Sequence, residues 1–140
     1  METLRWKVRI ALLGIIAAVS MSAHMILITF DAAAVKSANE WAASAGQADW
    51  VVTTLFWLGP LWLAFVVMTL QGKSGRWVTL VAATLLTILN VWHFFICAVP
   101  LLPGGPYPHP TAHHILLVGS SVVATALIVW YAWNWPKQDA

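Results

Sequence analysis

Four apolar runs, each about twenty residues long, constrain this chain more than any other feature. They cover residues 10–30, 50–70, 77–99 and 113–135. At about 1.5 Å per helical residue, a run of this length reaches roughly 30 Å, the thickness of the hydrocarbon core of a bilayer. The chain is also 61% hydrophobic and only 9% charged, which leaves too few charges for the polar surface of a soluble domain. The sequence therefore predicts an all-α polytopic integral membrane protein with four transmembrane helices, forming one membrane domain over residues 1–140.

The basic residues predict how the chain crosses the bilayer. All but Lys36 fall on one side of the four runs, at Arg5, Lys7, Arg9, Lys73, Arg76 and Lys137. By the positive-inside rule, both termini and the tight basic turn expected at 71–76 lie in the cytoplasm. The short connections favour an antiparallel bundle, N-in and C-in, in a membrane such as the bacterial inner membrane. The chain has no Lys/Arg-rich run of the kind that would indicate nucleic-acid binding.

Two features interrupt the apolar pattern on or near the outer side. Residues 31–49 are polar and alanine-rich, and they predict a short amphipathic helix on the membrane surface with Trp41 as its anchor. Asp49 is expected to cap the next helix. Gly59-Pro60 lies in the middle of the second run and predicts a kink, because proline removes a backbone hydrogen bond and clashes with the preceding turn.

All five histidines are expected in the outer third of the molecule. His24 lies 14 residues after the start of the first run, roughly 21 Å from the cytoplasmic boundary. His93 lies 16 residues after the start of the third run, roughly 24 Å from the same boundary. His109, His113 and His114 belong to the proline-rich outer loop at 100–112 or to the start of the fourth run. The sequence thus places His24 and His93 at similar depths beneath that loop.

This arrangement leads to the hypothesis of a transition-metal site. Imidazole suits zinc and copper, and nearby thiolate or thioether groups shift the preference toward copper. Cys97 follows His93 by four residues on one helix face, and Met21 and Met25 flank His24. The candidate ligands are His24, His93, His109, His113, His114 and Cys97. Such a site would serve metal handling or a small redox centre, although no compact metal motif accompanies it and no catalytic residue is assigned.

Other interpretations remain open from the sequence. The histidines would have purely structural roles if they form interhelical hydrogen bonds or meet water at the interface. A b-haem between His24 and His93 is a weaker candidate, because only Lys36 on the outer side could pair with its propionates. Trp57 and Trp62 lie in mid-membrane, which favours contact with a partner, a lipid or a hydrophobic ligand near the kink. The main alternative is accordingly an accessory or assembly subunit of a larger membrane complex, or a homo-oligomer formed through the second helix.

Overall fold

The computed structural model describes residues 2–98 and 112–136, with side chains for residues 2–96 and 115–136. Within these ranges the regular structure is helical and contains no strand. The helices are α1 (Glu2–Ile28), α2 (Ala32–Ser44), α3 (Gln47–Thr69), α4 (Gly72–Ala98) and α5 (Ala112–Trp133). Helices α1, α3, α4 and α5 are long and apolar enough to cross a membrane. The described part of the chain therefore has the all-helical, membrane-spanning character that the apolar runs predict.

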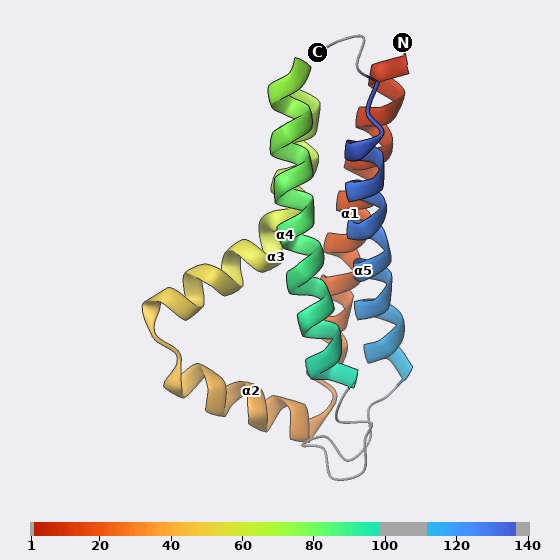
Figure 1. Cartoon of the computed structure of the whole chain (residues 1–140). Coiled ribbons are helices and arrows are strands. Elements are labelled where there is room, and N and C mark those ends of the chain that lie inside the picture. Colours follow the sequence, from red (N-terminus) through yellow and green to blue (C-terminus); the bar gives the residue numbers. More distant parts are fainter. Residues whose placement is uncertain (1, 99–111, 137–140) are drawn as a thin grey trace.

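The four long helices lie side by side, and successive ones run in opposite directions (Figure 1). Helix α1 packs against α3 and α5, and α4 packs against the same two helices. Helices α1 and α4 therefore face each other diagonally. An apolar core lies toward the end that holds the start of α1 and the end of α5. It consists of Ile10, Leu63, Val67, Ala83, Leu86, Ile128 and Trp135. Buried polar residues occur at this end, at Lys7 and Thr79, and also farther from it, at His24, Asn90 and Ser121.

Two glycines allow α3 to approach its neighbours closely. A Cβ atom on Gly14 of α1 would lie 2.7 Å from the carbonyl oxygen of Pro60. A Cβ atom on Gly59 would lie 2.7 Å from a methyl carbon of Leu86 on α4. Small residues at such crossings are a common basis of helix packing in membranes, because lipid supplies no hydrophobic force between helices.

Two basic side chains bind the carboxyl ends of neighbouring helices. Lys7 donates a hydrogen bond from Nζ to the carbonyl oxygen of Leu70, just after α3, at 2.6 Å. Arg76 donates to the carbonyl oxygens of Ala132 and Trp133, at 3.2 and 2.7 Å, in the last turn of α5. The last carbonyls of a helix have no partner within the helix and carry the negative end of its dipole. Lys7 and Arg76 therefore stabilise helix ends, in addition to contributing to the positive charge at this end of the helices.

The connection between α3 and α4 is shorter than the sequence predicts. Residues 71–76 were expected to form a turn, but α4 begins at Gly72, and Lys73 and Arg76 are helical. Gly72 has a φ of 63°, a left-handed conformation that glycine adopts without the steric cost of a Cβ atom. The chain therefore reverses direction with only Leu70 and Gln71 between the two helices.

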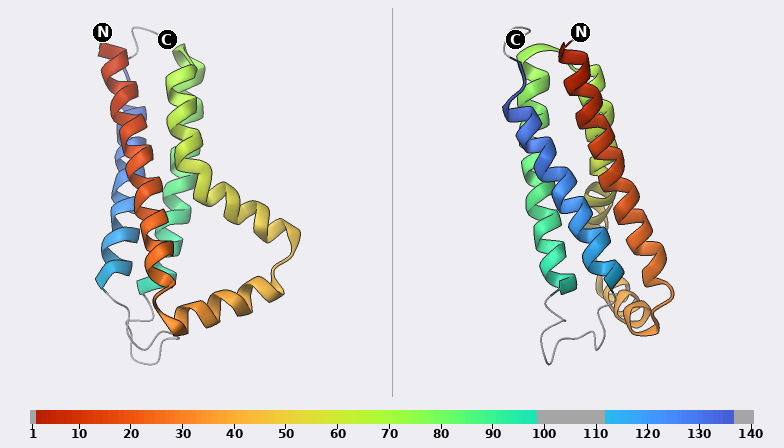
Figure 2. Two further views of the ribbon diagram at one scale, coloured as in Figure 1. Left: turned by 180° about the vertical axis from the view of Figure 1, so that it is seen from behind. Right: turned by 90° about the vertical axis from the view of Figure 1, so that its right-hand side faces the viewer.

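Helix α3 bends near its middle, where Pro60 lies, as the proline predicts (Figures 1 and 2). Proline has no N–H to donate to the carbonyl of Phe56, one turn earlier, and its ring crowds that carbonyl. The half of α3 that precedes the bend turns away from the other long helices. Its N-terminal end meets the C-terminal end of α2 (Figure 2). Trp41 of α2 and Trp50 of α3 form an edge-to-face contact there, with ring centroids 5.0 Å apart.

Helix α2 and the N-terminal half of α3 form a projecting corner. Each of these two helices begins with a hydrogen bond to a carboxylate. Asp31 is the N-cap of α2, and its Oδ1 accepts from the backbone N–H groups of Ala33 and Ala34 at 2.9 and 3.2 Å. The N-cap of α3 is Gly46, whereas Asp49 was expected to cap this helix. Asp49 acts from the first turn instead, where its Oδ2 accepts from the N–H of Gly46 at 2.8 Å. This bond satisfies a donor at the start of α3.

Candidate functional site

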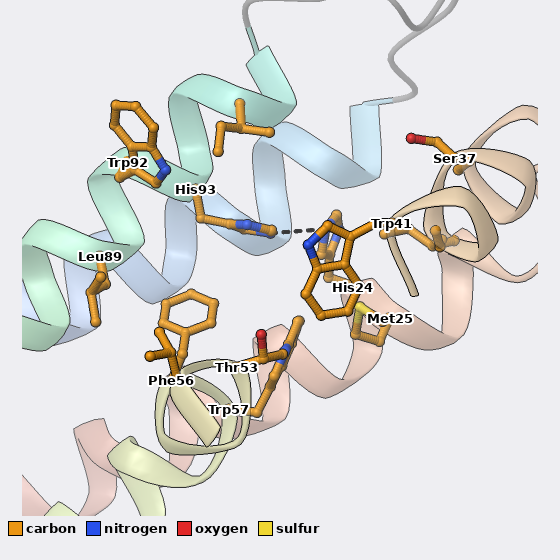
Figure 3. A pocket seen from close by; sticks show the side chains of 15 residues that line it. His24, Met25, Ser37, Trp41, Thr53, Phe56, Trp57, Leu89, Trp92 and His93 are labelled. Atoms are coloured by element: carbon orange, nitrogen blue, oxygen red, sulfur yellow. Dashed lines mark hydrogen bonds between the residues drawn. The ribbon is translucent and has the colours of Figure 1, made fainter. Parts of the chain in front are cut away.

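The structure brings together His24 of α1 and His93 of α4. Their Nε2 atoms are 3.4 Å apart, and the rings meet nearly at right angles with centroids 5.5 Å apart (Figure 3). His24 is fully buried, and His93 is half-buried. The prediction that the two residues lie at similar depth is therefore confirmed, although they are 69 positions apart in the chain.

A buried polar group lies one helical turn below these histidines and sets the orientation of their helices. Met21 precedes His24 by three residues, and Asn90 precedes His93 by three. The hydroxyl of Ser121 on α5 lies 2.7 Å from Asn90 Oδ1 and 3.3 Å from Met21 Sδ. All three residues are at least 98% buried. Because residues three apart share a helix face, contacts that turn Met21 and Asn90 inward also turn His24 and His93 inward.

The importance of Ser121 was not predicted from the sequence. Its only sequence signal is a polar residue in an apolar helix, which normally faces a neighbouring helix. The polar residues on α1 and α4 carry the same signal, but the spacing within one helix does not reveal which residues of different helices meet. The Ser121–Asn90 contact depends on how α4 and α5 pack.

Aromatic rings from α3 surround one side of His93. The ring centroid of Phe56 lies 5.5 Å from that of His93, and the ring centroid of Trp57 lies 6.2 Å from it. Both residues lie in the half of α3 that precedes Pro60. The bend therefore determines which groups face His93. Trp62, the other mid-membrane tryptophan, lies after the bend. Its side chain is 60% exposed and points away from the packed helices.

A cavity of about 570 Å³ lies beside the histidines, between α1, α2, α3 and α4. His24 and His93 form part of its wall, and the aromatic side chains of Trp41, Phe56, Trp57 and Trp92 form much of the remainder (Figure 3). Met25 lines the same cavity and brings a thioether close to His24. Four different helices contribute to this single concave surface.

The other predicted ligands are not placed with His24 and His93. His113 and His114 belong to the first turn of α5, but their side chains and that of Cys97 lie outside the described set. His109 lies outside the described residues altogether. Among the side chains that the structure describes, no group of three or more His, Cys, Asp or Glu residues is arranged to hold a metal ion. The structure therefore shows two adjacent imidazoles. It does not show where the side chains of the other candidate ligands lie relative to them.

The class defined by these features is a helical membrane protein whose first and third long helices present two adjacent histidines next to an aromatic cavity. Comparisons of the chain with protein-family models, with curated proteins and with solved structures found no match.

Proposed function

We propose that this protein is an antiparallel four-helix membrane bundle, N-in and C-in, that binds a zinc or copper ion near its outer face through His24 and His93. The observation that carries the proposal is the 3.4 Å distance between the two Nε2 atoms. Two nitrogen ligands of one tetrahedral ion, each about 2.0–2.1 Å from the metal, lie roughly 3.3–3.4 Å apart. An N–H···N hydrogen bond is normally nearer to about 3 Å. The observed distance fits a shared ion, and the same two Nε2 atoms also satisfy the geometry of an N–H···N hydrogen bond in the metal-free protein.

The distance also favours a small ion over haem. Axial ligands bind a haem iron from opposite faces, so two nitrogens at about 2.0 Å from the metal would be about 4 Å apart. The porphyrin ring would also have to pass between His24 and His93, whose Nε2 atoms are only 3.4 Å apart. A bis-histidine haem would therefore require the two helices to separate.

Further ligands would come from groups at the outer ends of α4 and α5. Cys97 is seven residues after Asn90, and His114 is seven residues before Ser121. Seven residues are close to two helical turns, so both positions share a helix face with a member of the buried polar group. His109 and His113 are alternative ligands. Thiolate from Cys97 or thioether from Met25 would shift the preference from zinc toward copper.

The test is the metal content of protein purified without chelator and without a metal-affinity tag, measured by elemental mass spectrometry. The expected content is about one ion per wild-type chain, with a loss of affinity of about 100-fold or more in His24→Ala and His93→Ala. Thr79→Val is a matched control, because Thr79 is as fully buried as His24 and shares α4 with His93 but does not line the histidine cavity. This variant should keep the wild-type content. Wild-type protein with less than about a tenth of an ion per chain, or full occupancy in both histidine variants, would refute the proposal.

A further inference from the structure

We infer that the cavity beside His24 and His93 binds a membrane-soluble molecule with a planar ring and a carbonyl oxygen, a ligand of the quinone class. Its volume of about 570 Å³ is within the range of about 300–1,000 Å³ that is usual for small-molecule sites. The metal proposed above would occupy only the gap between two nitrogen atoms. The remaining space therefore has no role in that proposal.

The walls of the cavity favour a flat apolar ring. Indole and phenyl groups line it on three helices, at Trp41 of α2, Phe56 and Trp57 of α3, and Trp92 of α4. Aromatic side chains pack well against other rings in offset or edge-to-face arrangements. No Asp, Glu, Lys or Arg is among the described residues that line the cavity, so a charged solute would lose its hydration without gaining a partner.

The polar groups of the cavity favour a ligand with a hydrogen-bond-accepting oxygen. His24 and His93 lie side by side in its wall, close to Phe56 and Trp57 (Figure 3). Ligand sites of this kind combine apolar walls with a few polar groups that fix orientation. A carbonyl oxygen of the bound ring would approach His93, which is half-buried, rather than His24, which is fully buried, and a bound metal would add a Lewis acid at the same place. The inference therefore does not depend on the metal.

The rim of the cavity indicates that the ligand enters from the bilayer. Val52 and Trp92 line the cavity and are 57% and 67% exposed. Both residues lie on helices that are apolar enough to span a membrane. In a bilayer, an exposed rim on such helices would face lipid, so a molecule dissolved in the bilayer would reach the cavity without crossing water. The contact between Trp41 and Trp50 holds the projecting corner of α2 and α3 together around this opening.

The test measures binding of decylubiquinone to the full chain in lipid nanodiscs, by quenching of tryptophan fluorescence. Ala38 lines the cavity from α2, so Ala38→Phe should fill part of it and weaken binding by about tenfold or more. Ala43→Phe is the matched control, because Ala43 is exposed on the same helix and does not line the cavity. It should bind the probe as the wild type does. Equal binding by both variants, or no saturable binding by the wild type, would exclude the inference.

Two further measurements separate this inference from its alternatives. Competition with 1-decanol tests whether the cavity recognises only an alkyl chain. Full recovery of tryptophan fluorescence at 1-decanol concentrations similar to that of decylubiquinone would contradict a ring-specific site. Binding is also measured after chelator treatment and after loading with zinc. Saturable quinone binding by a protein that never holds metal would refute the metal proposal alone. Full metal content without quinone binding would refute the cavity inference alone.

Discussion

Lys7 is 91% buried in a chain with very few charges, and its ammonium group donates to the carbonyl of Leu70. A buried cation is costly unless it is paired, and here the partner is the electronegative carboxyl end of α3. Lys7 therefore has a structural role that its charge alone does not indicate. Arg76 makes the equivalent contact with the end of α5.

We predict that Lys7→Met lowers the free energy of unfolding by about 1–3 kcal/mol, because it removes a charge-assisted hydrogen bond and leaves the Leu70 carbonyl without that donor. The measurement is thermal unfolding of the purified protein in detergent. Lys73→Met is the control, since it removes the same charge from an exposed position of α4. Equal destabilisation by the two variants would show that net charge, and not the Leu70 contact, is responsible.

Ser121 illustrates how a residue outside a site positions the residues within it. Its hydroxyl contacts Asn90 and Met21, which belong to the two helices that carry the histidines. Three helices thereby share one buried hydrogen-bonding group. Rotation of α1 or α4 about its own axis would break these contacts as well as separate His24 from His93. A polar contact of this kind fixes how each helix is rotated about its own axis. Apolar side chains alone do this poorly in a membrane, because they are nearly as stable against lipid as against each other.

At the level of helices, α3 combines a bend with two close crossings. Pro60 is buried, and its carbonyl oxygen would lie only 2.7 Å from a Cβ atom on Gly14. On the other side, Gly59 provides the space that Leu86 of α4 occupies. The bend is therefore fixed between α1 and α4. Because it is fixed, the half of α3 that carries Phe56 and Trp57 projects at a defined angle and encloses the cavity.

We predict opposite effects for the same substitution at two helical glycines. Gly119→Ala should be neutral or stabilising, since its Cβ would lie 3.6 Å from Phe94, an ordinary contact, and alanine favours the helix by about 1 kcal/mol. Gly14→Ala should destabilise by about 1–3 kcal/mol, since its Cβ would lie 2.7 Å from a backbone oxygen that cannot move freely. Unfolding titrations in mixed detergent would measure both. A stabilising Gly14→Ala would contradict the close crossing of α1 and α3.

For the whole molecule, the sequence predicts the membrane-spanning helices and the depth of the histidine pair for definite physical reasons. Lipid forces an apolar segment of this length to satisfy its backbone within a helix, so length and composition suffice. The constant rise of 1.5 Å per residue then converts the positions of His24 and His93 into depths. The bend at Pro60 follows from the missing N–H. These properties are local and need no knowledge of how helices pack.

The cavity and the helix-end contacts could not be predicted in this way. They depend on side chains from distant parts of the chain, such as Lys7 with Leu70 and Trp57 with His93. No periodicity within one segment encodes these contacts. The turn at 71–76 was predicted incorrectly because its polar residues resemble a loop, whereas the left-handed conformation of Gly72 lets the helix start at once. The positions of His109, His113, His114 and Cys97 relative to the histidine pair remain predictions.

The proposed orientation in the membrane has its own test. In a Cys97→Ser background, Ala43→Cys on α2 should react with an impermeant maleimide added to intact cells, because the positive-inside rule places α2 outside. Ser74→Cys lies near Lys73 and Arg76 at the opposite end of the helices and should react only after lysis. The reverse labelling pattern would overturn the N-in, C-in orientation and place the histidines near the cytoplasmic face.

The packing of α1 against α5 has a consequence for biosynthesis. The ribosome makes α5 after α1, α3 and α4, so a chain that has not yet reached α5 holds these three helices without Ser121. In that intermediate the side-chain oxygen of Asn90 lacks the Ser121 hydroxyl, and the faces of α1 and α4 that bury Met21 and Asn90 are open to lipid. An unsatisfied polar group in hydrocarbon costs several kcal/mol. A chain that terminates before α5 would therefore display an intramembrane polar face that the chain with α5 buries.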